Sequence, residues 1–536
     1  MWSEGEPEEH SREGKVADLK ELLEEVCKAK EEAQAGGGVE AVARQHSQGK
    51  LTARERIERL LDHGSFTEID MLVESRKTGF DVDRRRLPGD GVVAGYGEID
   101  GRPVGIFAQD FTVLGGSIGG VHCRKVIKVM ERCLRVRMPC IGIIDSSGIR
   151  IQDAVTLPKR DSWAAMFRLQ CTASGVIPQV SLMMGPCAAG AAYSPILTDF
   201  VLMVNGTSHM YIAPPTLIKS ATSMETTEEE IGGAWMHASK SGCCDLVAEN
   251  DEDCLRKARM LMGYLPLNNA SSTPRGSTAD PAERREEGLL GLVPADPKRA
   301  YDMKRLISMV VDRDSLLEIK PDFARNMITA FARLHGQVVG IVANQPMVLG
   351  GAIDIDASDK EARFIRFCDA FDIPLIFFVD TPAYLPGVQQ EQGGIIRHGA
   401  KVIYALSESM VTKITVVIRK AFGGGQVAMC NEPMGADLIL AWPTAQVGLM
   451  SPEGAVDIIY RRQIAAAEDP EAFRRRKIEE YLAVVGEEPF HSAGMGFVEE
   501  IIDPRDTRPR LIRALEIFSC KHSEERPQRR HGNMPL

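Results

Sequence analysis

The feature that most constrains this chain is an internal repeat. Four landmarks of its first half return in its second half, each 234 or 235 residues later: Gly101-x-x-Val104-Gly105 as Gly336-x-x-Val339-Gly340, Val113-Leu114-Gly115-Gly116 as Val348-Leu349-Gly350-Gly351, Pro139 and Asp145 as Pro374 and Asp380, and residues 179–191 as residues 413–425. Four landmarks at a nearly constant offset are hard to attribute to chance. The sequence therefore predicts that one domain has been duplicated.

The two copies meet in residues 268–288, where Ser, Thr, Pro and charged residues replace apolar periodicity. We therefore predict a first domain of residues 1–275 and a second of residues 276–536. Each copy alternates short β-rich apolar runs with helical patterns, as around residues 141–145 and 179–184. This alternation predicts an α/β fold built from β-β-α or β-α-β units.

Two helices are predicted ahead of the first copy. The first carries an apolar stripe of helical spacing, formed by Val16, Leu19, Leu22, Leu23 and Val26. The second begins at Thr52-Ala53-Arg54-Glu55, a capping box that leads into Ile57, Leu60 and Leu61. We expect both helices to cover the core.

Composition and charge exclude two kinds of partner. The chain has 536 residues, of which 44% are hydrophobic and 26% charged, as in an ordinary globular protein. Its formal net charge of −11 argues against nucleic acid, because phosphate contact needs concentrated Lys and Arg. Apolar runs such as residues 374–379 are too short to cross a membrane, and the acidic start is unlike a signal peptide.

Cysteine and histidine spacing gives no support for a metal site. The twelve cysteines contain no C-x-x-C pair, and the eleven histidines show no H-E-x-x-H or H-x-H spacing. Several cysteines lie in apolar stretches, namely Cys140, Cys171, Cys187, Cys368 and Cys430. We interpret them as buried free thiols in a reducing cytoplasm or organelle matrix.

Each copy contains a strand that runs directly into a turn of small residues. The first turn contains Ala189, Gly190 and Ala191, and the second contains Gly423, Gly424 and Gly425. Small residues let the backbone approach a ligand closely, and a helix that begins there leaves N–H groups pointing outward. Such a turn suits an anion or a developing oxyanion.

Each turn is paired with an upstream loop that follows an Asp, residues 145–150 in the first copy and 380–387 in the second. A single turn of this kind more often serves only close helix–strand packing. Because the device occurs twice at equivalent positions, we favour two oxyanion sites. The alternatives are weaker: no P-loop motif or G-x-S-x-G elbow occurs at these turns, and Ser194 with His209 is a poor candidate for a protease-like dyad.

Longer motifs run through the chain: residues 45–56 (QHSQGKLTARER), 89–93 (GDGVV), 109–113 (QDFTV), 193–195 (YSP), 393–401 (GGIIRHGAK), 441–445 (AWPTA) and 531–536 (HGNMPL). They resemble the biotin-dependent acyl-CoA carboxyltransferases, which include the propionyl-CoA carboxylase β subunit, the methylmalonyl-CoA decarboxylase α subunit and the transcarboxylase large subunit. The resemblance covers nearly the whole chain from about Gly14.

The resemblance implies tandem crotonase-like (ClpP/crotonase) β-β-α superhelix domains, assembled as a homo-hexamer. It implies transfer of a carboxyl group between carboxybiotin and the α-carbon of a short acyl-CoA, with a propionyl-CoA-like substrate favoured. Acyl-CoA would lie on the first domain and carboxybiotin on the second domain of another subunit. A nitrogen of biotin would act as the base, so no catalytic side chain is required.

The resemblance also places the two oxyanions. The enolate of the acyl-CoA would lie near the backbone of Gly148, Ile149, Ala189, Gly190 and Ala191. The biotin oxygen would lie near Gly423, Gly424 and Gly425, beside Ala383 and Tyr384. Fixed main-chain donors at each place would lower the barrier by about 3 kcal/mol.

The chain departs from the family pattern beside both turns. Ser147 and Ile149 replace a Gly and an Ala of the usual D-S-G-G-A-R loop, and Ala383 and Tyr384 replace a Gly and a Phe in the second loop. Val427 occupies a position where propionyl-type enzymes often carry Asp. We expect Ser147, Ala383, Tyr384 and Val427 to contact the substrates and to reshape the acyl pocket.

The chain has no A/V-M-K-M biotinylation site and no ATP-grasp glycine-rich motif. A biotin carboxylase and a biotin carboxyl carrier, or the membrane subunits of a decarboxylase, are therefore expected on other chains. Two alternatives stay open. One is the α subunit of an acyl-CoA decarboxylase, which transfers the carboxyl group in the opposite direction; the other is a non-catalytic crotonase-like scaffold, favoured only by the altered loops.

Overall fold

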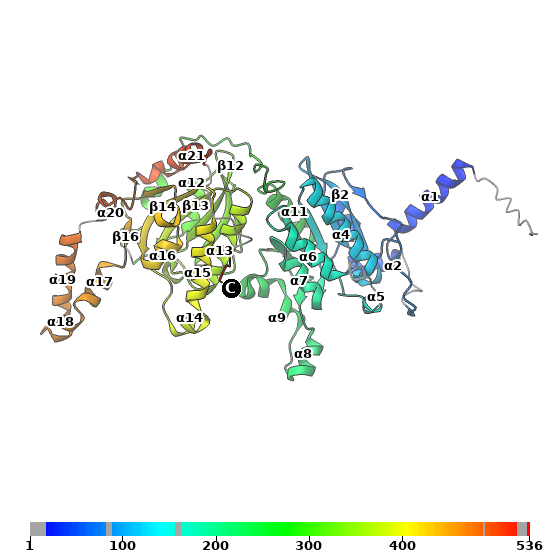
Figure 1. Ribbon diagram of the computed structural model, residues 1–536, viewed down its shortest axis with the longest axis horizontal. Coiled ribbons are helices and arrows are strands. Elements are labelled where there is room, and N and C mark those ends of the chain that lie inside the picture. Colours follow the sequence, from blue (N-terminus) through cyan, green and yellow to red (C-terminus); the bar gives the residue numbers. More distant parts are fainter. Residues whose placement is uncertain are drawn as a thin grey trace, which may run out of the picture.

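The computed structural model describes residues 18–81, 88–155, 162–296, 298–485, 488–521 and 533–535. Within these residues, two helix-covered sheets lie side by side along the long axis of the molecule, one from each half of the sequence (Figure 1). The start of the first predicted domain and the end of the second lie outside the described residues, as do His531, Gly532 and Leu536 of the closing motif. The boundary between residues 275 and 276 stays a prediction.

The first sheet follows the order β1 (Thr67–Glu68), β2 (Val92–Ile99), β3 (Arg102–Gln109), β4 (Cys140–Ile144), β5 (Gln179–Met183), β7 (Phe200–Val204) and β9 (Leu246–Ala248). The pairings from β1 to β3 are antiparallel and those from β3 to β9 are parallel. β6 (Pro186–Ala188) pairs with β8 (His209–Tyr211) beside it. The helices of this half are α4 (Gly120–Val136), α5 (Ile151–Ala154), α6 (Trp163–Ala173), α7 (Tyr193–Ile196), α8 (Pro215–Thr222), α9 (Glu228–Gly232), α10 (Ala234–Met236) and α11 (Asp251–Met262).

The second sheet follows the order β10 (Leu317–Ile319), β11 (Met327–Leu334), β12 (Gln337–Asn344), β13 (Leu375–Thr381), β14 (Lys413–Phe422), β15 (Leu438–Ala441) and β17 (Glu500–Ile501), and β16 (Gln446–Gly448) pairs with the end of β14. The pairings are antiparallel from β10 to β12 and parallel from β12 to β17. The helices are α12 (Met303–Val310), α13 (Ile355–Ala370), α14 (Val388–Gly393), α15 (Ile395–Glu408), α16 (Gly423–Ala428), α17 (Pro452–Ile459), α18 (Arg461–Ala466), α19 (Pro470–Val485), α20 (Phe490–Gly494) and α21 (Thr507–Phe518).

The two sheets share one strand plan, which confirms the predicted duplication. After each antiparallel hairpin the chain makes a short 3-10 turn, Leu114–Gly116 in the first copy and Leu349–Gly351 in the second. Leu114 and Leu349 both have positive φ angles, 52° and 50°. A branched side chain rarely adopts this backbone conformation, so its presence in both copies reflects a common local design.

A buried lysine is duplicated as well, which the sequence did not predict. Lys125 on α4 donates to the carbonyl oxygen of Val92 over 2.6 Å, and Lys360 on α13 donates to that of Met327 over 2.7 Å. Val92 and Met327 begin β2 and β11. Burial lowers the pKa of Lys125 to about 8 and that of Lys360 to about 7. Each lysine fixes its helix to the start of the hairpin.

One hydrophobic core continues across the two halves. The ring of Phe200 on β7 lies 5.9 Å from that of Phe331 on β11 and 4.7 Å from that of Phe367 on α13, between centroids. The hydroxyl of Tyr264 donates to the carbonyl oxygen of Ser315 over 2.7 Å. The halves therefore pack against each other within a single chain.

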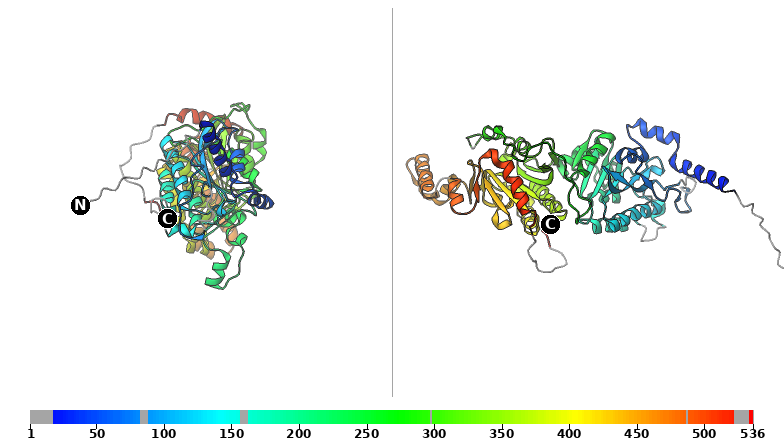
Figure 2. Two further views of the ribbon diagram at one scale, coloured as in Figure 1. Left: turned by 90° about the vertical axis from the view of Figure 1, so that its right-hand side faces the viewer. Right: turned by 90° about the horizontal axis from the view of Figure 1, so that it is seen from above.

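The predicted N-terminal helices differ in what they bury. The capping box is confirmed at α3 (Ala53–Leu60), where Thr52 and Glu55 each accept a backbone N–H of the other. Ile57 and Leu60 of α3 are fully buried. The expectation that the first helix also covers the core is wrong: α1 (Leu19–Gln34) projects from the body (Figure 2), and its Leu19, Leu22, Leu23 and Val26 are 43–68% exposed. Val16 lies outside the described residues, and α2 (Val39–Ser47) joins α1 to the body.

Two further segments extend away from the sheets, α8 in the first half and α17–α19 in the second (Figure 1). Among the described residues, no helix is both long enough and apolar enough to cross a membrane.

Candidate active site

Each predicted turn begins with a residue in the left-handed region of backbone conformation. Ala189, which opens the first turn, has a φ of 57°, and Gly423, its counterpart 234 residues later, has a φ of 54°. Such a φ costs an alanine about 1–2 kcal/mol relative to the right-handed region, whereas glycine adopts it freely. The first copy therefore keeps a strained turn that the second copy reaches without strain.

The upstream loops are held in the same way in both copies. Ile149 forms a parallel bridge with Ile118, and Tyr384 forms one with Ile353. The N–H of Ile118 donates to the carbonyl oxygen of Gly148 over 2.8 Å, and that of Ile353 donates to Ala383 over 3.1 Å. Ile149 and Tyr384 are thus equivalent positions, 235 residues apart.

The structure brings each loop against its turn. A Cβ added to Gly190 would lie 3.3 Å from Cδ1 of Ile149, and one added to Gly424 would lie 3.1 Å from Cδ2 of Tyr384. A Cβ added to Gly425 would lie 3.4 Å from Cα of Ala383. Loop and turn residues that the sequence predicted to act together are therefore neighbours.

The N–H groups of the loop are not equivalent donors. The N–H of Gly148 donates to Oγ of Ser146 over 3.0 Å, and that of Ser147 donates to the carbonyl oxygen of Gly115 over 2.9 Å. Gly148 has a φ of 105°, a backbone conformation that suits glycine. Ile149 carries the next N–H along the chain, and its side chain lies against the turn at Gly190. The first N–H groups of a helical turn, here those of residues 189–191 and 423–425, have no partner within the turn itself.

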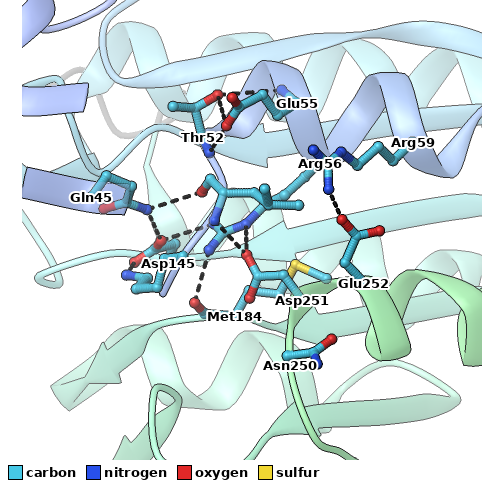
Figure 3. Close-up of polar contacts among 12 residues, drawn as sticks. Gln45, Thr52, Glu55, Arg56, Arg59, Asp145, Met184, Asn250, Asp251 and Glu252 are labelled. Atoms are coloured by element: carbon cyan, nitrogen blue, oxygen red, sulfur yellow. Dashed lines mark hydrogen bonds and ion pairs between the residues drawn. The ribbon is translucent and has the colours of Figure 1, made fainter. Parts of the chain in front are cut away.

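A buried ionic cluster lies where β4 and β5 end (Figure 3). The carboxylate of Asp145, at the end of β4, is fully buried and accepts from Nζ of Lys50 over 2.7 Å, from Nη1 of Arg56 over 2.8 Å and from Nε2 of Gln45 over 3.0 Å. Arg56 also donates to the carbonyl oxygen of Met184 over 3.0 Å. Arg56 therefore connects the ends of β4 and β5, from which the first loop and turn extend.

The surroundings of Lys50 in this cluster shift its pKa. Burial is the largest influence and lowers the pKa of Lys50, while the neighbouring carboxylate of Asp145 opposes that shift. Nε of Arg56 is further paired with Asp251 over 2.7 Å. A carboxylate taken out of water needs such partners, because an unpaired buried charge is costly.

The second copy neutralises the equivalent aspartate differently. Asp380 is fully buried and accepts from Nε of Arg419 over 3.0 Å, and burial raises its pKa. Arg419 occupies the position of Gly185 in the first copy. A Cβ on Gly185 would lie 1.9 Å from Oδ1 of Asp145 and 3.0 Å from Nζ of Lys50. Gly185 thus leaves room for a lysine from elsewhere in the chain.

The sequence missed these cationic partners. Lys50 and Arg56 were noted only as part of a motif, and Asp145 and Asp380 only as landmarks of the repeat. One signal was available in the sequence. Both copies keep the aspartate, but the position that carries an Arg in the second copy carries a Gly in the first.

Other predicted residues lie as follows. Ser147 is exposed, and Val427 is half-buried on α16, one helical turn from Gly423. The candidate dyad does not form, because Oγ of Ser194 accepts from Gln170 over 2.9 Å and Nε2 of His209 contacts Glu229 at 3.1 Å.

All twelve cysteines are free thiols, and each lies within the described ranges. Cys140, Cys187, Cys368 and Cys430 are buried as predicted, but Cys171 is exposed on α6. An apolar local sequence does not reveal which side of a helix faces solvent. Within the described part of the chain, no group of three or more His, Cys, Asp or Glu side chains could hold a metal ion.

The duplicated β-β-α plan, with a backbone-lined turn in each copy, defines a tandem crotonase-like protein. The carboxyl transferase domain family matches residues 44–534, and the chain belongs to this family.

Known relatives match this chain over nearly their whole length. The chain is 48% identical to the methylmalonyl-CoA decarboxylase subunit alpha of Veillonella parvula, over 97% of this chain and 100% of that protein. It is 47% identical to the propionyl-CoA carboxylase carboxyltransferase subunit of Haloferax mediterranei, with the same coverage. A crystal structure of transcarboxylase 12S, described as a hexamer assembly with methylmalonyl-coenzyme A and methylmalonic acid bound, matches with a TM-score of 0.93 at 45% identity, over 97% of this chain and 99% of that one.

These relatives confirm the predicted fold and the predicted family, the biotin-dependent acyl-CoA carboxyltransferases.

Proposed function

We propose that this chain transfers a carboxyl group between carboxybiotin, carried on a separate protein, and the α-carbon of a short acyl-CoA of the propionyl-CoA or methylmalonyl-CoA type. One observation carries the proposal: both copies present the same turn, opened by a left-handed residue and faced by the same loop position. Carboxyl transfer between two carriers develops negative charge on oxygen at two places. A duplicated turn provides two sets of donors for it.

In the first copy, we assign the enolate oxygen of the acyl-CoA to the N–H groups of Ile149 and residues 189–191. Gly148 shapes the loop, and Ser147 lies at its exposed edge. Main-chain donors held in place before the reaction need no reorganisation, and losing one such donor typically costs about 3 kcal/mol of transition-state stabilisation. The buried Asp145–Arg56 pair holds the strand ends that carry these donors.

In the second copy, we assign the oxygen of the biotin ring to the N–H groups of residues 423–425, with Ala383 and Tyr384 beside them. Gly424 is exposed and Tyr384 partly so, which leaves this turn open to a ring that arrives on another protein. Biotin supplies the carboxyl group and a ring nitrogen that can take the α-proton. The chain itself positions the two substrates, donates hydrogen bonds to their oxygens and excludes water from the site.

We further propose a homo-hexamer, in which the first turn of one subunit faces the second turn of another. The two turns of one chain lie in different halves of the molecule, as the positions of α7 and α16 in Figure 1 show. The transcarboxylase 12S relative is described as a hexamer assembly. The exposed apolar residues of α1 offer a surface for such contacts. A biotin carboxyl carrier and a biotin carboxylase would come from other chains.

A transfer assay tests this proposal. The purified chain is incubated with acetyl-, propionyl-, butyryl- or methylmalonyl-CoA, with free biotin or carboxybiotin as the second substrate. We expect biotin-dependent conversion of methylmalonyl-CoA to propionyl-CoA, and the reverse with carboxybiotin. A chain that binds coenzyme A but turns over none of these would instead be a non-catalytic scaffold.

The similarity to the Veillonella parvula subunit supports a second candidate, the α subunit of a methylmalonyl-CoA decarboxylase. Both candidates use the same two turns and differ in direction, which the partner subunits set. Co-purification with an ATP-dependent biotin carboxylase would favour carboxylation. Co-purification with a polytopic membrane subunit would favour decarboxylation.

A further inference from the structure

The loop of residues 145–150 has one free backbone donor. Five of its six N–H groups donate to acceptors within the protein, and only the N–H of Ile149 has none in the part of the chain that the structure describes. The next N–H, that of Arg150, donates to the carbonyl oxygen of Ile118 over 3.0 Å. The direction of the free donor therefore depends on how firmly the rest of the loop is held.

The first N–H of this loop is held by a buried amide. Oε1 of Gln109, the last residue of β3, accepts the N–H of Asp145 over 3.1 Å. Because that oxygen is the acceptor, the amide turns its NH2 group the other way, where it lies 3.3 Å from Nε2 of His122 on α4. Gln109 thus donates to His122, and Nε2 is the unprotonated nitrogen of the imidazole.

The imidazole of His122 has a single polar partner among the described residues. Its other nitrogen, Nδ1, carries the proton and has no acceptor there, and the side chain is fully buried. Burial, together with the charges of Arg150 and Lys125, lowers the pKa of His122 to about 3, so the ring is neutral at ordinary pH. The polar character of this buried ring therefore serves one contact, the hydrogen bond that it accepts from Gln109.

His122 and the first turn line the same small cavity. The cavity has a volume of about 10 Å³, roughly the room that one water molecule needs. Its walls include Gln109 and His122 together with Ala191 and Ser194, which belong to the first turn and to the helix that follows it. With so little space between them, the ring has no room to turn without displacing its neighbours.

The second copy keeps the amide but ends it on a different side chain. Oδ1 of Asn344, at the equivalent position, accepts the N–H of Asp380 over 3.1 Å. Its Nδ2 donates to Sδ of Met429 over 3.4 Å, and Ala357 occupies the position of His122. An amide between the duplicated aspartate and a third side chain thus belongs to the repeated plan, and of the two turns only the first uses a histidine.

We propose that His122 is a positioning residue for carboxyl transfer at the first turn. It keeps the amide of Gln109 in one orientation, Gln109 holds the N–H of Asp145, and the loop then presents the N–H of Ile149 to the enolate oxygen of the acyl-CoA. The inference rests on the enolate site of the proposed function. His122 touches no substrate and exchanges no proton. Without its lone pair the buried NH2 group of Gln109 lacks an acceptor, and the amide rotates away from the loop to find one.

Three substitutions of His122 separate its hydrogen-bond acceptor from its bulk. Glutamine places a carbonyl oxygen where Nε2 lies, asparagine places its amide where Nδ1 lies, and phenylalanine keeps a ring without an acceptor. The full-length protein is assayed for biotin-dependent carboxyl transfer from methylmalonyl-CoA. We expect kcat/KM of His122→Gln within about threefold of wild type, and that of His122→Asn and His122→Phe at least about tenfold lower, because a misplaced donor slows the reaction without losing the site.

A spectroscopic measurement distinguishes positioning from a general loss of structure. Infrared difference spectra of bound propionyl-CoA, isotope-labelled at its carbonyl carbon, report the C=O stretching frequency, which falls when N–H groups donate to the oxygen. We expect wild type and His122→Gln to lower this frequency below its value in water, and His122→Phe to lose most of the shift. Met429→Leu, the matched change in the second copy, should keep the full shift while transfer slows.

The outcomes separate this inference from the proposed function. No frequency shift in wild type would overturn the enolate site at the first turn, and the inference with it. A wild-type shift that His122→Phe retains, together with wild-type transfer, would overturn the role of His122 alone. An equal loss of the shift in Met429→Leu would also overturn it, because the effect would not belong to the first turn. If His122→Phe does not fold, the smaller change His122→Asn carries the same prediction.

Discussion

Nη1 of Arg56 lies 2.8 Å from the carboxylate of Asp145, and neither side chain is exposed to solvent. The same guanidinium donates to Met184 and pairs with Asp251, so one arginine ties α3 to the ends of two strands (Figure 3). In the second copy, Arg419 reaches Asp380 from β14 itself. The duplicated aspartate is therefore neutralised by cations from different parts of the chain.

This relationship predicts a large stability effect at Arg56 and a small one nearby. Arg56→Met leaves two buried carboxylates short of a cation, which should lower the free energy of unfolding by about 3–5 kcal/mol. Arg59→Met, on the same helix, removes an ion pair with the exposed Glu252 and should cost less than about 1 kcal/mol. Urea denaturation of both variants checks this. Equal destabilisation would contradict the role of the buried cluster.

The left-handed turn residues predict effects of opposite sign. Ala189→Gly removes strain and should leave the free energy of unfolding unchanged or raise it by up to about 1 kcal/mol, while Gly423→Ala should lower it by about 1–2 kcal/mol. Thermal and chemical denaturation of the two variants measure the difference. If Ala189→Gly lowers the free energy of unfolding, the methyl group of Ala189 makes a contact that stabilises the fold by more than the strained backbone costs.

Asp199, where the two halves meet, predicts a pH dependence of stability. Burial raises its pKa to about 6, above the value of about 4 in an unfolded chain. The folded state thus holds this proton more tightly, and the stability present below pH 4 is lost as the pH rises through 6.

Asp199→Asn can still accept the N–H of Gln179 but does not titrate. Relative to this variant, the wild-type free energy of unfolding should fall by on the order of 2–3 kcal/mol between pH 4 and pH 7. Denaturant melts across that range measure it, and a constant difference between the two proteins would refute the assignment.

Val427 tests where the acyl group lies. Val427→Asp introduces a carboxylate one helical turn from Gly423 and should shift the ratio of kcat/KM between propionyl- and butyryl-CoA by about tenfold, since one methylene in a pocket is worth about 1–3 kcal/mol. Val427→Ile is the apolar control. If neither variant changes the ratio, the acyl pocket is lined by other residues.

Much of the fold and of the site could be predicted from the sequence, because the repeat indicated both turns and the capping box indicated α3. The partners of Asp145 could not, since Lys50 and Arg56 precede it by 95 and 89 residues and their burial depends on the complete core. The apolar stripe of α1 predicted a helix correctly but not its exposure. Periodicity shows which side of a helix is apolar, not what covers it.

The most direct test of the two-turn mechanism compares three glycine variants in biotin-dependent carboxyl transfer from methylmalonyl-CoA. Gly190→Val and Gly424→Val place a side chain against Ile149 and Tyr384, whereas Gly494→Val on α20 has no atom within 4 Å of the new Cβ. We predict that the first two lose at least about 100-fold in kcat/KM with the oligomer intact, and that Gly494→Val stays within about twofold. Wild-type turnover in either turn variant would contradict the mechanism.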